Sequence, residues 1–315
     1  CFSSFAPRKL RRRARDKMRS TMKLQLTIIA LLLSLTATAQ NIVLTSDRQE
    51  DKSVIIRVDK QGYGRYTLAI KFKDLDNCDF VPNDSYLIRS STDLIRLRPL
   101  YPKAHVGYSY SYRWWNGDLH TKPDTTFVYR FPLSDLKPCK ITECYDLYDV
   151  MFGQSSCENF TSYYFPCQRG DTVFVARRGE VVEVQRERVA PQQGIAYTSN
   201  RANVIIEHDD GTRAEYSMVD PDNLFVTEGE VVTPDRPLGL VGTFNNDRYG
   251  FYFSLHYKVW KVKGEKVINH YFPPLFQTDL GVTRLRHVVE YRAVVDDELI
   301  EREMSGREKR HRKRQ

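Results

Sequence analysis

The sequence predicts a mainly β protein with two successive antiparallel β domains. Apolar and polar residues alternate over short runs rich in Val, Ile, Tyr and Phe, a pattern typical of half-buried strands. Glycines and turn dipeptides separate these runs, and residues 42–130 show no helical periodicity. A length of 315 residues is itself expected to give about two domains.

Charge is unevenly distributed along the chain. The formal net charge is +8, but residues 1–39 alone carry +8 and the last eleven residues carry +5. Residues 40–304 therefore carry −5, which argues against a basic, nucleic-acid-binding body. With 41% hydrophobic residues the chain can bury a core, and a polytopic membrane protein is excluded because only one stretch is continuously apolar.

That apolar stretch has the features of a secretory signal peptide. A positive charge at residues 22–23 precedes a mostly apolar run at 24–35, and the Ala-Thr-Ala sequence at 37–39 suits cleavage. A dozen apolar residues are too few to span a bilayer, which needs about 20, and a buried core helix would not explain these features in this order. We interpret residues 1–39 as an upstream extension plus this signal. The mature chain is then exported, to the periplasm or the extracellular cell envelope, with no transmembrane span.

Residues 40–138 are expected to form an antiparallel, β-sandwich-like N-terminal domain. Its predicted strands lie at residues 53–58, 66–72, 108–112 and 126–131. Asn116-Gly117 is a strong tight-turn signal between the last two strands.

An aromatic cluster in this domain has two interpretations. Tyr108, Tyr110, Tyr112, Trp114 and Trp115 could stack on carbohydrate, or they could form the face of a sheet that packs into the core. We favour the core, because aromatic residues in alternating strands more often pack inward.

A second β-rich domain is predicted over residues 139–276. Its strand-forming runs lie at residues 170–182, 203–216, 226–232, 238–242 and 253–259. Asp210-Gly211 suits the turn of a hairpin within the 203–216 run. Residues 277–315 are expected to be a C-terminal extension, with a polar helix over 287–304 and a frayed, solvated basic tail from residue 307.

Four segments of the second domain resemble, in order and spacing, the M23 (lysostaphin/LytM-type) peptidase family. They are Gly170-Asp-Thr-Val-Phe-Val-Ala with Gly179, the hairpin at 203–216, the runs at 226–232 and 238–242, and Phe253-Ser-Leu-His-Tyr-Lys-Val. The resemblance covers about residues 150–262, and the preceding β-rich module also looks like envelope M23 proteins of the Bacteroidota. It implies a mostly antiparallel β core. Members of the family are secreted zinc endopeptidases that cut peptide cross-links of bacterial peptidoglycan.

The residues at the family's chemical positions are largely different in this chain. The resemblance implies zinc ligands from a His, an Asp and the second His of a His-Leu-His motif, with two further histidines that assist the attacking water. Tyr164 stands near the aspartate position, whereas Met218 and Ser254 occupy the assisting positions. No histidine lies in the segment of the first ligand, so of the five positions only His256 is retained.

These departures predict binding rather than catalysis. A catalytic zinc needs about three protein ligands, and neither Met218 nor Ser254 can shuttle a proton at neutral pH. We therefore predict no catalytic residue and no cofactor. The former groove is expected to be lined by His256, Tyr164, Met218, Tyr216, Ser254 and Tyr257. Its expected partners are peptidoglycan peptides or a cell-wall hydrolase that the domain regulates.

The cysteines of an exported chain are disulfide candidates before they are metal ligands. The simplest pairs are the local ones, Cys139–Cys144 and Cys157–Cys167, with Cys78 unpaired, although the sequence does not fix the connectivity.

One alternative keeps the family's chemistry. Cys157 and Cys167 flank the lost ligand segment, and with His256 they would make a Cys₂His site, a set known for catalytic zinc. The chain would then be an active zinc metalloendopeptidase with an atypical ligand set.

Two further polar groups are interpreted as structural. His208 precedes Asp209-Asp210-Gly211 and belongs to the hairpin rather than to a metal site. The loop of Asp220, Asp222 and Asn223 has a calcium-like composition but no EF-hand spacing, so turn chemistry explains it.

Overall fold

The described part of the chain is mainly β, with mostly antiparallel strand pairing, as the sequence predicts. The computed structural model describes residues 41–135, 137–144, 157–189, 199–244, 248–263 and 265–314. The predicted signal peptide and the extension before it lie outside the described residues. Within the described ranges, no helix has both the length and the apolar character needed to cross a membrane.

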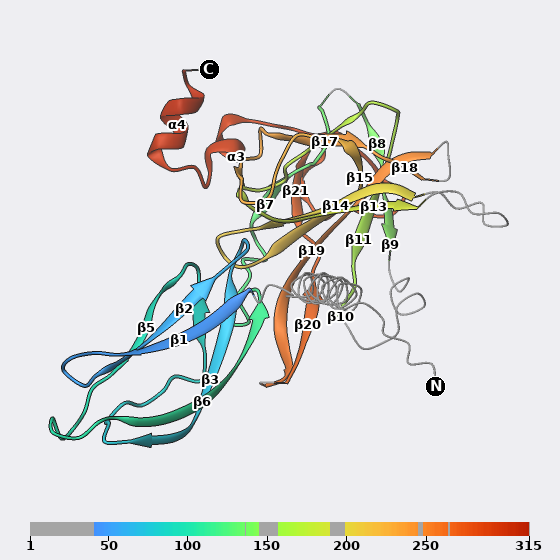
Figure 1. Cartoon of the computed structure of the whole chain (residues 1–315). Coiled ribbons are helices and arrows are strands. Elements are labelled where there is room, and N and C mark those ends of the chain that lie inside the picture. Colours follow the sequence, from blue (N-terminus) through green and yellow to red (C-terminus); the bar gives the residue numbers. More distant parts are fainter. Residues whose placement is uncertain are drawn as a thin grey trace, which may run out of the picture. The chain divides into compact units, whose positions relative to one another are not determined.

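Two three-stranded sheets make up the first β module (Figure 1). The first sheet has the order β1 (Ile42–Arg48), β2 (Val54–Lys60) and β5 (Thr92–Leu97). The second sheet has the order β4 (Tyr86–Ile88), β3 (Tyr66–Asp76) and β6 (Gly107–Asn116). All of these pairings are antiparallel.

Both sheets of the first module contribute to one apolar core. In β2, Val54, Ile56 and Val58 are buried and the residues between them are more exposed, which is the period-two pattern of a strand with one buried face. Leu68 and Ile70 of β3 belong to the same buried cluster. The two sheets therefore share a core, as expected of a sandwich-like arrangement.

The aromatic residues of β6 pack mostly toward this core. Tyr108, Tyr110, Tyr112 and Trp114 are partly buried against it, as the core interpretation predicts. Trp115 is not part of that cluster and instead meets Trp260 edge to face, with ring centroids 4.3 Å apart. These aromatic side chains are therefore mainly packing residues.

The turn predicted at Asn116-Gly117 does not lead into a hairpin. Gly117 has a φ of 108° and follows the end of β6, as a turn glycine should. However, β7 (Val128–Arg130) pairs in parallel with β21 (Leu275–Thr278) instead of with β6. The Gly117 amide donates to the Arg65 carbonyl at 2.7 Å, and its carbonyl accepts from Thr67 Oγ1 at 2.8 Å. These bonds hold the turn against the start of β3, so the chain does not reverse along β6.

A twelve-stranded sheet forms the centre of the second module. Its main path runs through β10 (Cys157–Glu158), β20 (Lys266–Tyr271), β19 (Arg248–Val262), β18 (Thr243–Phe244), β14 (Ser199–Glu207), β15 (Arg213–Leu224), β17 (Pro237–Val241) and β12 (Thr172–Phe174). Beside this path, β19 pairs with β11 (Ser162–Cys167), β11 pairs with β9 (Thr142–Cys144), and β14 pairs with β13 (Gly179–Val189), which pairs with β16 (Val231–Val232). β19 also pairs with β15, which places β15 and β11 on opposite edges of β19.

The hairpin predicted at Asp210-Gly211 is confirmed. β14 and β15 are antiparallel neighbours whose pairing ends at Glu207 and Arg213. The loop closes through a hydrogen bond from the His208 amide to the Thr212 carbonyl at 2.8 Å. Gly211 takes a φ of 87°, a left-handed conformation that glycine adopts without steric cost.

The second module has its own apolar core. Phe165 of β11 stacks on Phe251 of β19 with ring centroids 4.8 Å apart. Phe253, two residues further along β19, contacts Tyr216 at 5.1 Å and Phe276 at 5.5 Å. Phe276 brings β21 into this core together with Tyr129 of its partner β7, whereas its other partner, β22 (Gly281–Thr283), remains outside.

The C-terminal extension departs from the polar helix predicted over 287–304. Residues 287–296 are not helical, and they include β23 (Glu290–Tyr291), which pairs with β8 (Cys139–Lys140). Tyr291 and Ala293 are buried in the second core. Their tertiary contacts require an extended chain, which overrides the local pattern of charges.

The basic tail is helical and ion-paired rather than frayed. The chain forms α3 (Asp297–Glu301) and then α4 (Gly306–Arg312), and a capping box closes the first turn of α4. Arg312 pairs with Asp297 at 2.7 Å and with Asp235 at 3.3 Å. Acidic partners outside the tail therefore hold it in place, and composition alone did not reveal them.

Replacing Phe253 with alanine should destabilise the protein by about 3–5 kcal/mol, because the fully buried ring leaves a cavity between three strands. Phe225→Ala is the matched control, since Phe225 is 43% exposed, and it should cost less than about 1 kcal/mol. Urea unfolding of both variants measures the two losses. Losses of equal size would contradict the position of Phe253 in the second core.

Candidate functional site

β19 lies between the two strands that carry most of the predicted site. Ser254 of β19 is opposite Ser162 of β11 on one edge and opposite Glu215 of β15 on the other. Two residues earlier, Tyr252 is opposite Tyr164 of β11, and their rings lie 5.0 Å apart. The register therefore brings three separate segments of the sequence together.

The two faces of β19 differ in character, because successive residues of a strand point to opposite sides. Phe251, Phe253 and Leu255 point into the second core. The other face carries polar and aromatic side chains, and we call it the polar face. It comprises Ser162, Tyr164, Arg213, Glu215, Ser217, Tyr252, Ser254 and His256.

The structure brings together only part of the predicted lining. The predicted residues on the polar face are Tyr164, Ser254 and His256. Tyr216 is fully buried in the second core, where its hydroxyl accepts a hydrogen bond from the Ala176 amide at 2.7 Å. Tyr257 also lies on the core side and contacts the Phe272 ring at 5.9 Å. Each of these tyrosines is next in sequence to a residue of the polar face, so strand alternation directs its side chain to the opposite, core side. Both tyrosines are therefore packing residues.

Met218 lies where the alternation of β15 breaks. It has a φ of 70°, and the pairing between β14 and β15 shifts register next to it. Its side chain is buried but belongs to neither apolar cluster, and its carbonyl accepts from the Gly242 amide at 2.9 Å.

A pocket of about 300 Å³ adjoins this region. Gly242, which binds the Met218 carbonyl, and Tyr249, whose carbonyl accepts from the Tyr164 hydroxyl at 3.3 Å, both line it. Its polar lining includes Arg169, Asp220 and Asn223.

The acidic residues beside this pocket lie within β15 rather than in the predicted loop, where the pairing of β15 with β17 shifts register between Val219 and Leu224, and local contacts hold them. The Asp222 amide and the Asn223 side-chain amide each donate to the Asp220 carboxyl at 2.9 Å. Side-chain contacts of the kind found in turns therefore account for these residues, as the sequence predicts.

His256 is buried and neutral at pH 7. Burial, reinforced by the positive charges of Arg213 and Lys258, lowers the pKa of His256 to about 3. The imidazole lies 5.1 Å from the Tyr271 ring. Its Nδ1 atom has no hydrogen-bond partner in the described part of the chain.

The end of the polar face around His256 is rich in buried cations. Arg213 is directly opposite His256, and its guanidinium binds the Glu207 carboxylate at 2.6 Å. Burial, with a contribution from Arg213, lowers the pKa of Lys258 to about 8. Glu207 also forms an ion pair with the Arg65 guanidinium at 3.8 Å and accepts a hydrogen bond from the Arg65 backbone amide at 2.9 Å. One buried carboxylate therefore serves several positive groups.

The middle of the polar face carries Glu215, whose surroundings disfavour ionisation of its carboxyl group. Burial raises the pKa of Glu215, and the negative charge of Glu183 adds to this effect. The Ser217 hydroxyl donates to Glu215 at 3.2 Å and partly offsets both causes. Glu215 is thus a largely buried carboxyl group whose neutral form is favoured by its surroundings.

The zinc implied by the family resemblance does not fit the residues present. The side chains at the family positions are the phenol of Tyr164, the thioether of Met218, the hydroxyl of Ser254 and the imidazole of His256. Among the residues that the structure describes, no three His, Cys, Asp or Glu side chains are grouped so that they could hold a metal ion. The alternative ligands Cys157, Cys167 and His256 are therefore not brought together.

Strand register separates Cys157 from Cys167, one of the two predicted disulfide pairs. Cys167 is opposite Tyr249, whereas Cys157 is opposite Asn269, which is itself opposite Lys258. Tyr249 and Lys258 are about 30 Å apart along β19, at about 3.3 Å per residue, and a disulfide needs Cα atoms within roughly 7 Å. The predicted pair Cys157–Cys167 is therefore wrong.

The predicted pair Cys139–Cys144 is also wrong, because the two cysteines lie at different levels of β11. Cys144 is opposite Ser162, whereas the Cys139 thiol donates to the Pro166 carbonyl at 3.4 Å. Ser162 and Pro166 are about 13 Å apart along β11. The structure has free thiols at Cys78, Cys139, Cys144 and Cys167.

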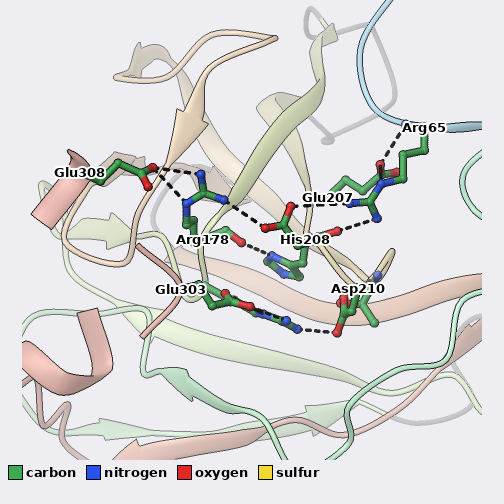
Figure 2. Close-up of polar contacts among 10 residues, drawn as sticks. Arg65, Arg178, Glu207, His208, Asp210, Glu303 and Glu308 are labelled. Carbon is green, nitrogen blue, oxygen red and sulfur yellow. Dashed lines mark hydrogen bonds and ion pairs between the residues drawn. The ribbon is translucent and has the colours of Figure 1, made fainter. Parts of the chain in front are cut away.

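An arginine–carboxylate network holds the hairpin loop at residues 208–212 (Figure 2). Buried Arg177 binds Asp210 at 2.8 Å and Glu303 at 2.7 Å. Arg178 binds Glu308 at 3.0 Å, as Figure 2 also shows. The C-terminal segment is thereby tied to the loop between β14 and β15.

His208 is part of this loop, as the sequence predicts. Its Nδ1 lies 2.9 Å from the Arg178 carbonyl, which can only accept, so Nδ1 carries the proton. Burial, with the positive charge of Arg177, lowers the pKa of His208 to about 3. Its Nε2 is buried with no hydrogen-bond partner among the described residues. His208 is therefore a neutral structural histidine.

Sequence reasoning missed Arg213, Glu215 and Tyr252. The signal that would have found them is the period-two alternation in Arg-Ala-Glu-Tyr-Ser at 213–217 and Tyr-Phe-Ser-Leu-His at 252–256. Once His256 is placed on the polar face, the same count assigns Tyr257 to the core side.

Comparisons with known proteins return only distant structural likenesses. No family model matches the chain, and no curated protein matches it. A chain of the SpoIIQ–SpoIIIAH pore-forming complex is 14% identical, with 46% of this chain and 89% of that chain covered and a TM-score of 0.27. A zinc-containing peptidase from Vibrio cholerae is 11% identical over 67% of this chain and 74% of its own, with a TM-score of 0.31. Csd3 of Helicobacter pylori is 11% identical over 87% and 77%, with a TM-score of 0.29.

Acid should destabilise the protein through its two buried histidines. His208 and His256 have pKa values of about 3 when folded and 6.5 when unfolded, so the unfolded chain binds more protons between these values. The free energy of unfolding should fall as the pH is lowered from 6.5, by up to about 1.4 kcal/mol per pH unit for each histidine.

The variant His256→Gln should remove its share of this slope, whereas His105→Gln, at an exposed position, should leave the slope unchanged. Urea unfolding between pH 7 and pH 4.5 measures both. An unchanged slope in His256→Gln would mean that this histidine is not buried in its neutral form.

Proposed function

We propose that this chain is an exported cell-envelope protein whose second module is a catalytically degenerate M23-like domain that binds peptides instead of cleaving them. One observation carries the proposal. Tyr164, Ser254 and His256 stand at family positions and lie on one face of the neighbouring strands β11 and β19, but Tyr164 is opposite Tyr252, about 13 Å along β19 from His256. Of the three, only His256 offers a common zinc ligand. The three positions share a face, whereas neither their spacing along the strands nor their side chains fit a zinc site.

The polar face has the properties of a peptide-binding surface. The adjacent rings of Tyr164 and Tyr252 are partly exposed and offer apolar contact, whereas Ser254 is buried beside them. A pocket large enough for a side chain lies next to Tyr249, whose carbonyl binds the Tyr164 hydroxyl, and charged and polar groups contribute to its lining. Mostly aromatic surfaces with a few placed polar groups are typical of ligand sites.

Peptidoglycan peptides are the ligand that we favour, because the family resemblance implies that substrate class. The other candidate is a cell-wall hydrolase, which would dock on the same surface and be regulated by it. The two differ in whether the isolated protein binds purified peptidoglycan. An active zinc metalloendopeptidase is the alternative function, and it would need ligands other than Cys157, Cys167 and His256.

A pull-down on purified peptidoglycan tests the proposal with the mature chain, residues 40–315. Tyr164→Ala should reduce retention about tenfold, because it removes an aromatic contact of the polar face. Tyr101→Ala is the matched control: this tyrosine is 72% exposed in the first module, and retention should not change. The unfolding temperature of each variant, measured alongside, shows that the fold is intact.

Zinc content and peptide release are measured on the same preparations. We expect far less than one zinc per chain by mass spectrometry and no release of peptide, with or without a chelator. Stoichiometric zinc together with chelator-sensitive release would replace the binding function by the metallopeptidase. Equal retention of wild type and Tyr164→Ala would remove the polar face from the proposal. Binding to an immobilised hydrolase without binding to peptidoglycan would favour the regulatory role.

A further inference from the structure

Two thiols that are distant in sequence meet at the same short stretch of β11. The Cys139 thiol donates to the Pro166 carbonyl at 3.4 Å, and the Cys167 thiol donates to the neighbouring Phe165 carbonyl at 3.3 Å. Because the Pro166 carbonyl carbon is bonded to the Cys167 nitrogen, the Cys139 sulfur lies within roughly 6 Å of the Cys167 Cα.

Both side chains also lie on the same side of the sheet. Cys139 is a buried member of the second core, and Cys167 packs against that core. Cys167 is two residues beyond Phe165, whose ring points into the core, so strand alternation places Cys167 on that side as well. The negative charge of one thiolate would raise the pKa of the other, and Cys139 has this effect on Cys167.

We propose that Cys139 and Cys167 form an intramolecular disulfide bond that joins β8 to β11 in the mature protein. The two other cysteines of this region are excluded as partners by the register, since Cys144 is opposite Ser162, and Cys157 is opposite Asn269 of β20, which is level with Lys258 of β19. The bond is independent of any peptide ligand and of the proposed function of the polar face.

The chemistry requires an oxidant, and a disulfide of another thiol compound supplies it. The two thiols give up two protons and two electrons as the sulfur–sulfur bond forms. The oxidant's disulfide accepts the electrons and protons and leaves as two thiols. In an exported protein this donor is the disulfide of a thiol oxidoreductase, and in the experiment it is oxidised glutathione.

Burial determines when the bond forms. Burial raises the pKa of the Cys139 thiol to about 12 and raises that of Cys167 as well, so little thiolate exists once the chain has folded. The exchange reaction should therefore occur during folding. In a chain without structure, loop closure favours the pairs closest in sequence, so formation of Cys139–Cys167 would report the fold rather than proximity along the chain.

The test refolds the reduced, unfolded mature chain in a mixture of reduced and oxidised glutathione. Remaining thiols are then alkylated, and the protein is digested with trypsin and with a protease that cleaves after glutamate. The sequence separates the candidates: Cys139 falls in residues 131–140, Cys144 and Cys157 in 144–158, and Cys167 in 159–169. We expect mass spectrometry to find residues 131–140 linked to residues 159–169.

Thermal unfolding gives a second readout. Adding reductant should lower the Tm of wild type by roughly 5–10 °C, as expected for loss of a disulfide in a chain of this size. Cys167→Ser should lose this sensitivity, and Cys157→Ser should keep it. A linkage through residues 144–158, or alkylation of both Cys139 and Cys167, would overturn the proposal. The peptide map of wild type decides the question even if Cys167→Ser does not fold.

Discussion

Strand β19 is paired along both edges, and this double pairing sets the position of everything else in the second module. β11 and β20 occupy one edge, whereas β15 and β18 occupy the other. A slip by one residue would exchange the core face for the polar face. Phe251, Phe253 and Leu255 prevent such a slip, because all three are fully buried in the second core. The polar face is thus the outer side of a strand whose inner side is fixed by packing.

Buried charges converge on the hairpin between β14 and β15 from distant parts of the sequence. Arg65 reaches it from the first module, and Glu303 reaches it through Arg177 from the C-terminal extension. Pairs of this kind add little net stability compared with apolar packing, but removing one partner leaves a buried charge and is costly. Their role in the fold is therefore to specify which segments meet. The charged C-terminal segment accordingly belongs to the structure of the second module.

Much of the fold follows from alternation and turn chemistry that the sequence displays. The strand beginning at Val54 and the hairpin at Asp210-Gly211 were predicted from residues close to one another in the chain. The failures share a different cause. Asn116-Gly117 does form a turn, but Arg65 and Thr67 bind it, and no local pattern indicates that contact.

For the site and the C-terminal extension, too, local patterns were predictable from the sequence, whereas contacts between distant segments were not. Tyr164, Ser254 and His256 were placed by motif order, which the register brings to one face. Tyr216 was assigned to the groove by its neighbourhood in sequence, although strand alternation directs it into the core. The extended chain at Tyr291 replaces the polar helix because burial in the second core outweighs local charge patterning.

Antiparallel sheets make distance in sequence a poor guide to distance in space, and the cysteines show this in both directions. Cys157 and Cys167 are close in sequence, yet their strand partners lie at opposite ends of β19. Cys139 and Cys167 are far apart in sequence, yet both thiols bind carbonyls of consecutive residues. A metal site faces the same constraint, because its ligands must come from strands that are neighbours at the same height. β11 and β19 do not satisfy this condition, because Tyr164 is opposite Tyr252, about 13 Å along β19 from His256. Residues spread along one face of a strand in this way suit contact with an extended peptide better than coordination of a single metal ion.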